Sequence, residues 1–181
     1  IDGEGNAGLT PGFNAYGAGI TTDGMFDNLH VEDVSVKNVY RRGIQIFDVS
    51  TGHEITGNSV DGVELVGNGY AIITFGGDVS ITDNIITNAT GGIAANFADT
   101  IGGTGPPLVT IQGNSITGAD IGMNLNGLDA GSLIGGPLAA QRNTIALAGG
   151  GADIGMTVAF VRGLVTVQNN EITGDGGDSA I

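Results

Sequence analysis

Residues 111–118 read Ile111-Gln112-Gly113-Asn114-Ser115-Ile116-Thr117-Gly118, in which an apolar–polar pair, Gly and Asn precede a second polar–apolar–polar run. The same arrangement begins at Ile55, at Ile81 and at Val167, and a partial copy begins at Arg142. It places Asn at positions 58, 84, 114, 143 and 170, so the repeat is 26 to 30 residues long. A repeat of this length predicts a solenoid.

Each repeat contains three short segments that resemble β-strands. Apolar and polar residues alternate in them, as in residues 44–46 and 165–167, which is the period of a strand. Gly, Asn, Thr and Val fill the repeats, whereas Ala, Leu, Glu and Lys fill helical repeats. We therefore predict an all-β parallel β-helix with three short strands per turn. Neighbouring turns lie roughly 4.8 Å apart, so about six to seven turns make a rod on the order of 30 Å long.

The pattern N-x-I-x-G followed by G-I-x-[IL] resembles the right-handed parallel β-helix repeat of the pectate-lyase-like superfamily. The five recurrent Asn residues and their flanks carry it, and residues 133–145 also resemble a motif common in bacterial surface proteins of this fold. The resemblance covers nearly the whole chain and implies one right-handed β-helix domain over residues 1–181. This superfamily includes lyases, hydrolases, epimerases, adhesins and stalks, so the resemblance selects no single function.

The recurrent Asn residues are predicted to serve the structure. Corners between strands leave backbone N–H and C=O groups unpaired, and an Asn amide can satisfy both kinds of group. Stacked in successive turns, the amides would form a ladder along the rod. Apolar residues on both sides of each corner should face the interior: Ile55, Val60, Ile81, Ile86, Ile111, Ile116, Ile145, Val167 and Ile172 in one set, and Ile44, Ile46, Ile72, Ile93, Ile121, Met123, Ile154 and Met156 in the other.

Composition restricts the classes of partner. The chain has 181 residues, no Cys and a net charge of −14, with only 5 Lys and Arg. Without Cys it has no disulfide framework and no thiolate metal site. An acidic chain disfavours nucleic acid and anionic membrane surfaces as partners, and neutral glycans remain open. No apolar run reaches the length of a membrane-spanning helix, so we expect no membrane insertion.

The first residues contain the candidate metal ligands of the sequence. Asp2 and Glu4 lie in an Ile-Asp-Gly-Glu-Gly-Asn segment and offer oxygen ligands for Ca²⁺. The spacing does not match a full calcium loop, so an ordinary turn is the favoured interpretation and no cofactor is otherwise expected. Because the chain begins at Ile1 without Met, we expect a processed form or a fragment of a longer protein. Residues 174–181 start another corner without an amphipathic cap, and open strand edges favour stacking, so we also expect another chain to contact its ends or sides.

A basic and aromatic segment is the candidate for catalysis. The possible catalytic residues are Lys37, Tyr40, Arg41, Arg42 and His53. A β-elimination enzyme needs a base and cations beside a sugar carboxylate, and these residue types can supply them. The competing interpretation is a set of surface ion pairs on an acidic rod. For the acidic residues the competing interpretations are a glycosidase pair among Asp48, Asp61, Asp78 and Asp83, and simple outward or corner positions, as expected for Asp120 and Asp153.

Two functions follow as expectations. The first is a non-catalytic, extracellular or cell-surface β-helix module, a stalk, adhesin-like surface or assembly subunit that presents polar faces to a glycan or protein partner. The second is a polysaccharide-active lyase, epimerase or glycoside hydrolase, or a fragment of one. The missing catalytic motifs and the regular Asn repeat favour the first.

Overall fold

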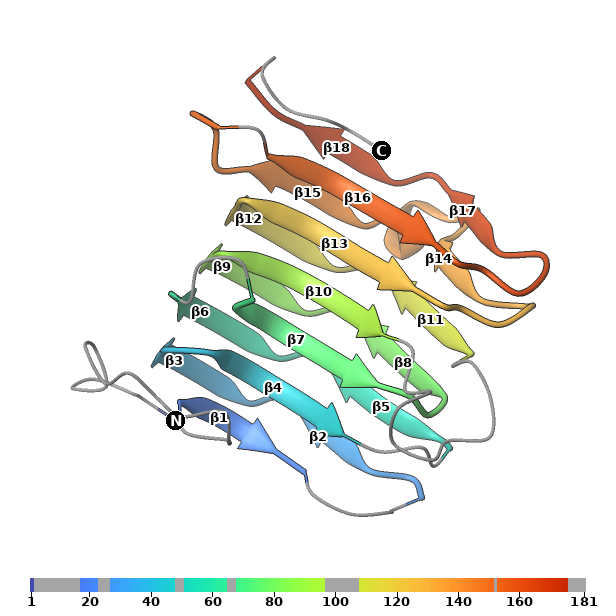
Figure 1. Ribbon diagram of the computed structural model, residues 1–181, viewed down its shortest axis with the longest axis horizontal. Coiled ribbons are helices and arrows are strands. Elements are labelled where there is room, and N and C mark those ends of the chain that lie inside the picture. The colour runs from blue at the N-terminus through green and yellow to red at the C-terminus, as the bar shows by residue number, and fades with distance from the viewer. Residues whose placement is uncertain are drawn as a thin grey trace.

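The computed structural model describes residues 1, 17–22, 27–47, 51–64, 68–96, 108–151 and 153–175 (Figure 1). Its strands form three parallel sheets of six strands each, and strands that are three apart in chain order are neighbours in the same sheet. The chain thus adds one strand to each sheet in every turn and completes about six turns. The all-β parallel β-helix with three strands per turn is confirmed, with the number of turns at the lower end of the expected range.

The three sheets are named here in the order in which the chain enters them. Sheet 1 consists of β1 (Ala18–Thr21), β4 (Arg42–Phe47), β7 (Tyr70–Phe75), β10 (Gly91–Asn96), β13 (Ile121–Asn126) and β16 (Ile154–Ala159). Sheet 2 consists of β2 (His30–Glu32), β5 (His53–Thr56), β8 (Val79–Thr82), β11 (Val109–Gln112), β14 (Leu133–Gly135) and β17 (Thr166–Gln168). Sheet 3 consists of β3 (Ser35–Val39), β6 (Ser59–Val63), β9 (Ile85–Ala89), β12 (Ser115–Ala119), β15 (Thr144–Leu147) and β18 (Glu171–Thr173). One 3₁₀ turn, η1 (Ala139–Gln141), lies between β14 and β15.

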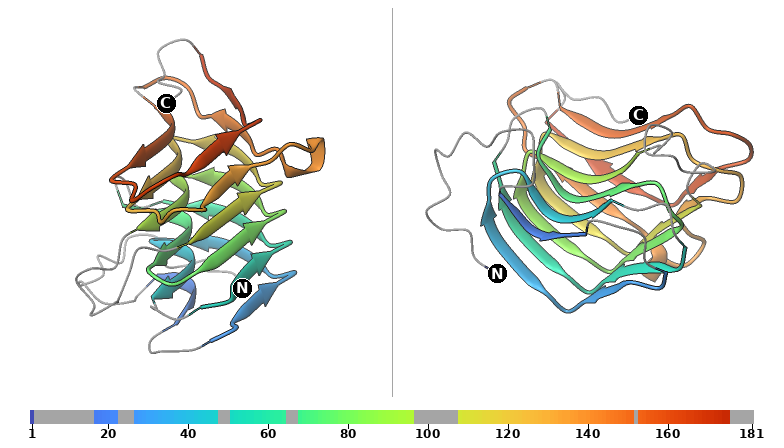
Figure 2. Two further views of the ribbon diagram at one scale, coloured as in Figure 1. Left: turned by 90° about the vertical axis from the view of Figure 1, so that its right-hand side faces the viewer. Right: turned by 60° about the horizontal axis from the view of Figure 1, so that its bottom comes forward.

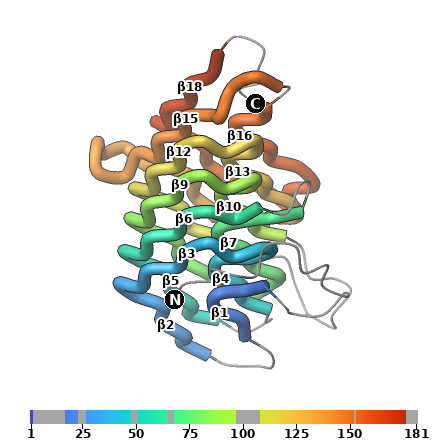
Figure 3. The backbone as a smooth tube through the Cα atoms, turned by 90° about the vertical axis from the view of Figure 1, so that its left-hand side faces the viewer, coloured from blue at the N-terminus to red at the C-terminus, as the bar shows by residue number. Residues whose placement is uncertain are grey.

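Equivalent strands of successive turns lie over one another along the rod (Figure 2). The first strands are at one end of the stack and the last strands are at the other (Figure 3). Residues about one repeat apart are therefore neighbours, as in the pairing of Ile111 with Ile81 and of Ile116 with Ile86. This arrangement generates columns of identical or similar side chains, which is why the apolar pattern of the sequence repeats.

The interior is filled by the predicted apolar columns. Ile55, Ile81 and Ile111 from sheet 2 are fully buried. They belong to one cluster with residues of sheet 3 such as Ile86 and residues of sheet 1 such as Ile72. Because each turn buries its apolar residues against those of the turns above and below, the core is continuous along the rod.

Three of the predicted interior residues do not lie in the interior as expected. Val167 is 41% exposed, because no further described turn covers β17. Ile121 and Ile154 pair with each other on the outer side of sheet 1, and both are only partly buried. Each of these Ile residues is followed by a Gly and then by Met123 or Met156. The Gly and the Met both face the core, so two consecutive residues point inward at this corner.

The Asn ladder is present as predicted. In each of Asn58, Asn84 and Asn114 the Nδ2 atom donates to the Oδ1 atom of the next Asn at 2.9–3.0 Å. The same Nδ2 atoms also donate to backbone carbonyls of the preceding turn, at 2.8–2.9 Å. Asn143 continues the ladder to Asn170 at 2.8 Å. The first four Asn side chains are at most 1% exposed, so the ladder satisfies polar groups that water cannot reach.

One interior column contains a hydroxyl. Thr74 is 1% exposed and pairs in register with Ile46 and Ala95, and its Oγ1 atom has no hydrogen-bond partner among the described residues. We expect Thr74→Val to raise the free energy of unfolding by about 1 kcal/mol, because valine has the same shape and needs no partner. Urea unfolding measures the change.

Thr82→Val is the matched control. The Thr82 hydroxyl donates to the Thr56 hydroxyl at 2.9 Å on the outer side of sheet 2, so its removal should not stabilise the protein. A loss of stability in Thr74→Val would show that the buried hydroxyl makes a favourable interaction.

Candidate ligand-binding face

Sheet 1 differs in charge from the rest of the rod. The chain contains 19 Asp and Glu residues, yet none lies in the six strands of sheet 1, whose only charged residue is Arg42. Glu32 and Glu54 lie in sheet 2, whereas Asp61 and Glu171 lie in sheet 3. The outer side of sheet 1 is therefore the least acidic surface that the strands of this protein present.

Aromatic and amide side chains occupy several of the outward positions of sheet 1, beside apolar residues such as Ile73 and Ala94. We call these residues the ligand face: Phe47, Tyr70, Phe75, Asn96, Asn124 and Asn126. The rings of Phe47 and Phe75 are in contact, with centroids 5.4 Å apart and planes inclined at 58°. On the same outer side of sheet 1, Ile73 and Ala94 are buried against Tyr70 and support it.

Tyr70 extends along the rod from one turn to the second turn above. A Cβ atom at Gly91 would lie 2.3 Å from Cδ1 of Tyr70, so only glycine leaves room for the ring there. Beyond Gly91, the Tyr70 hydroxyl accepts a hydrogen bond from Nδ2 of Asn124 at 2.9 Å. On its other side the guanidinium carbon of Arg42 lies 5.8 Å from the ring centroid. The ring is thus fixed at both ends, and because Tyr70 is only 4% exposed its role is to hold Asn124 in place.

The three Asn residues of the ligand face form a connected network. Asn126 donates from Nδ2 to Oδ1 of Asn124 at 2.6 Å and to Oδ1 of Asn96 at 3.3 Å. This network orients the amides and leaves the Oδ1 atom of Asn126 and the Nδ2 atom of Asn96 without a partner among the described residues. The face therefore offers both an acceptor and a donor to a ligand.

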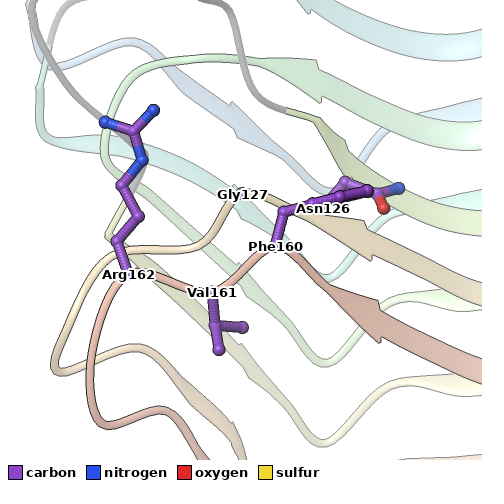
Figure 4. Close-up of a pocket in the computed structure, with 5 residues that line it drawn as sticks. All are labelled: Asn126, Gly127, Phe160, Val161 and Arg162. Carbon is purple, nitrogen blue, oxygen red and sulfur yellow. The ribbon is translucent and has the colours of Figure 1, made fainter.

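A pocket adjoins the end of the ligand face. It has a volume of about 460 Å³ and is lined by Asn126, Gly127, Phe160, Val161 and Arg162 (Figure 4). This volume is within the range of small-molecule sites in proteins. Asn126 belongs to both the pocket and the Asn network, so the two form one continuous surface.

Phe160 is held in an unfavourable backbone conformation beside this pocket. Its φ is 54°, in the left-handed region, whereas the equivalent corner one turn earlier has Gly127 with φ of 72°. A bulky residue in this region costs about 1–2 kcal/mol. The Phe160 side chain is 84% exposed, so burial does not offset the cost. Backbone strain that no packing interaction offsets is characteristic of functional positions.

Arg42 is the buried member of the predicted basic segment. Only 2% of its surface is exposed, and its NH2 group donates to Oδ1 of Asn68 at 3.0 Å. Burial lowers the pKa of Arg42 to about 10, with a further lowering from the charge of Arg41. The guanidinium is still charged at neutral pH and serves to hold Tyr70 and Asn68 in place.

The other residues of the predicted basic segment lie on different surfaces. Lys37 points outward from sheet 3, where it pairs in register with Asp61. Tyr40 and Arg41 lie at the corner between sheets 3 and 1. His53 faces the interior from sheet 2, is 1% exposed, and accepts a hydrogen bond from the backbone N–H of Leu29 at 3.4 Å. The predicted segment thus does not converge on one surface.

The predicted acidic candidates bind the backbone and neighbouring side chains. Asp61 accepts hydrogen bonds from Oγ1 of Thr87 at 2.7 Å and from Nδ2 of Asn88 at 2.8 Å, and these bonds lower its pKa. Asp78 accepts from the backbone N–H of Leu108 at 2.9 Å. Asp83 occupies a left-handed corner position with φ of 56°. Asp48, like the calcium candidates Asp2 and Glu4, lies outside the described residues.

Asp120 and Asp153 lie near one another at the corner that leads into sheet 1. Asp153 caps this corner by accepting a hydrogen bond from the backbone N–H of Gly149 at 2.9 Å. Desolvation and the negative charge of Asp153 raise the pKa of Asp120. A carboxyl whose pKa is raised by folding destabilises the native state once it ionises.

We therefore expect Asp120→Asn to stabilise the protein at neutral pH, by less than about 1 kcal/mol because the group is exposed. The gain should disappear as the pH falls through the raised pKa of Asp120, where the wild-type carboxyl is also neutral. Thermal melts of both proteins across this pH range test the expectation. An equal gain at every pH would contradict it.

The ligand face was not predicted from sequence, although a signal for it exists. The outward positions of β7, β10 and β13 include Tyr, Phe and Asn and hold no carboxylate, in a chain where acidic residues are frequent elsewhere. Comparison of the chain with protein-family models, with curated proteins and with solved structures finds no match in any of the three. In the part of the chain that the structure describes, no helix is long and apolar enough to cross a membrane.

Proposed function

We propose that this protein is a non-catalytic β-helix module that binds a neutral glycan on the ligand face and in the adjoining pocket. The observation that carries the proposal is one continuous surface of aromatic rings and amides, in strands without a carboxylate. Sugars present an apolar C–H face, which packs on aromatic rings, and hydroxyl groups, which pair with amide donors and acceptors. A neutral ligand also avoids the repulsion that an anionic polymer would meet from a chain of net charge −14.

In this proposal each part of the surface has a separate role. The half-buried Phe47–Phe75 pair provides ring surface, Tyr70, only 4% exposed, holds Asn124 in place, and the Asn network provides directional hydrogen bonds. Phe160 covers one side of the pocket and meets the ligand with its exposed ring. An extended surface across several turns suits an oligosaccharide chain, which can contact successive strands. The resemblance to β-helix proteins of the pectate-lyase-like superfamily supports an extracellular or cell-surface location, where such glycans occur.

A glycan array followed by titration calorimetry tests the proposal. We expect wild-type protein to bind at least one neutral oligosaccharide, and Asn126→Ala to weaken binding at least about tenfold, because it removes a network of hydrogen bonds. Ser115→Ala, on the outer side of sheet 3, is the control and should bind as wild type does. Absence of binding to every neutral glycan would overturn the proposal.

Phe160→Gly separates function from stability. Glycine accepts a left-handed φ without strain, so we expect this variant to be more stable than wild type by about 1 kcal/mol. We also expect it to bind the glycan at least about fivefold more weakly, because the exposed ring is lost. Thermal unfolding and calorimetry measure the two changes. A variant that is more stable and binds equally well would remove Phe160 from the site.

The same incubations test the enzyme alternative. Release of reducing sugar, or absorbance from an unsaturated product, would identify a hydrolase or a lyase and would contradict the non-catalytic assignment.

A further inference from the structure

A second cluster of polar side chains lies on the outer side of sheet 2, away from the ligand face. His30 and Glu32 are two residues apart in β2, so their side chains share one side of the strand. Glu54 in β5 is the register partner of His30. The Nδ1 atom of His30 lies 3.3 Å from Oε1 of Glu32 and 3.4 Å from Oε2 of Glu54. One ligand atom from each of the three residues lies within 4.8 Å of the other two.

We propose that His30, Glu32 and Glu54 bind a divalent transition-metal ion of the Zn²⁺ type. Zn²⁺ binds imidazole nitrogen and carboxylate oxygen at roughly 2.0–2.2 Å, so two ligands on one tetrahedral ion are roughly 3.3–3.5 Å apart. The two distances from His30 already have this value, and only the glutamates must approach each other. Three protein ligands leave a fourth position for water or for another ligand.

The residue types select the class of metal. Ca²⁺ and Mg²⁺ prefer sites built only from oxygen, whereas an imidazole ligand suits Zn²⁺, Ni²⁺ or Cu²⁺. The acidic chain raises the local concentration of cations in general but does not distinguish among them. The nitrogen of His30 is therefore the basis for selectivity, and we expect Zn²⁺ to bind much more tightly than Ca²⁺.

The backbone holds the three ligands in place before a metal arrives. The backbone N–H of Glu54 donates to the carbonyl oxygen of Leu29 at 2.9 Å, and Val31 pairs with Ile55 beneath the cluster. Both apolar side chains are buried, so β2 and β5 cannot slide past each other without exposing the core. Side chains about half exposed, as these three are, lose little hydration when a metal binds.

Binding would join the first strand of sheet 2 to the second. Because β2 is the terminal strand of the described sheet, it has a neighbour on one side only. A metal bound across β2 and β5 favours the native pairing and raises the melting temperature. The metal site is thus separate from the ligand face, and an ion bound there would stabilise this end of the stack.

Calorimetric titration of the full, chelator-treated chain with Zn²⁺ tests the proposal. We expect one ion per chain with a dissociation constant on the order of micromolar, and a tenfold or greater loss of affinity in both His30→Ala and Glu54→Gln. Glu171→Gln is the matched control, since it removes a carboxylate of similar exposure on sheet 3 and should leave Zn²⁺ affinity unchanged. Circular dichroism confirms that each variant is folded.

Two further measurements decide between the metal site and a simple ion-paired cluster. Co²⁺ should give the intense visible absorption of a low-coordinate ion in wild type and not in His30→Ala. Zn²⁺ should raise the melting temperature of wild type but not of His30→Ala. Zn²⁺ binding that is unchanged in His30→Ala, or no binding at millimolar Zn²⁺, would overturn the proposal and leave His30 as a partner of two glutamates only.

Discussion

Asn114→Ala is expected to cost about 3–5 kcal/mol of folding free energy, a large effect for the truncation of one polar side chain. The Oδ1 atom of Asn114 accepts from both the backbone N–H and the Nδ2 group of Asn84. Its Nδ2 atom donates to the carbonyl oxygen of Ile81 and to Oδ1 of Asn143. Alanine removes all of these bonds at a position that is 1% exposed, so the remaining groups are left buried without their partner.

Chemical unfolding of Asn114→Ala and of Ser115→Ala measures this prediction. Ser115 is adjacent in sequence but points outward from sheet 3, so its truncation should change stability by less than about 0.5 kcal/mol. Because the turns of a solenoid are coupled to their neighbours, the Asn114 variant should also unfold less cooperatively. Similar losses in the two variants would show that the ladder adds no particular stability.

Asn114→Asp provides a second test of the same ladder. A carboxylate can replace the acceptor but not the donor, and burial should raise its folded-state pKa above the unfolded value. Protonation of the Asp restores a donor. The variant therefore keeps its stability below the pKa of the unfolded state and loses it as the pH rises through the pKa of the folded state. Relative to Asn114→Ala, the variant should therefore recover stability toward about pH 4. A constant difference between the two variants would contradict this.

Gly122→Val is expected to destabilise the protein by about 3 kcal/mol or more, because the corner between sheets 3 and 1 has no space for a larger side chain. A Cβ atom at Gly122 would lie 2.3 Å from the carbonyl oxygen of Gly155 and 2.5 Å from Cγ2 of Ile145. Both neighbours are fixed, the first in the backbone of β16 and the second in the core. The backbone of adjacent turns must move apart to admit the valine.

Ala146→Val is the control for this prediction. Ala146 lies on the outer side of sheet 3, in register with Thr117, where β-branched residues fit. Its replacement should change the unfolding midpoint little. A stable Gly122→Val variant with unchanged thermal unfolding would show that the turns separate easily at this corner.

Much of the fold could be predicted because its interactions repeat. Each of Asn58, Asn84, Asn114 and Asn143 makes the same bonds in its own turn, so one explanation covers every copy. The alternation of residues inside and outside each strand also places His53 in the interior, because it has the same parity as Ile55. The prediction that His53 shares a site with Arg41 and Arg42 rested on residue type and overlooked this parity.

The candidate sites could not be predicted in the same way, because they do not repeat. Tyr70 reaches Asn124 only because Gly91 leaves room for its ring, and the two partners are 54 residues apart. His30 and Glu54 meet because register fixes them as neighbours across two strands.

The sequence alone thus determined the stacking of turns, the interior columns and the Asn ladder. A periodic pattern of apolar and amide residues buries the apolar side chains and pairs the amides when equivalent positions stack on one another. Tertiary structure alone decided which unlike side chains converge on the outer surface. Those contacts depend on register, corner geometry and side-chain direction, and none of these produces a repeating pattern in the sequence.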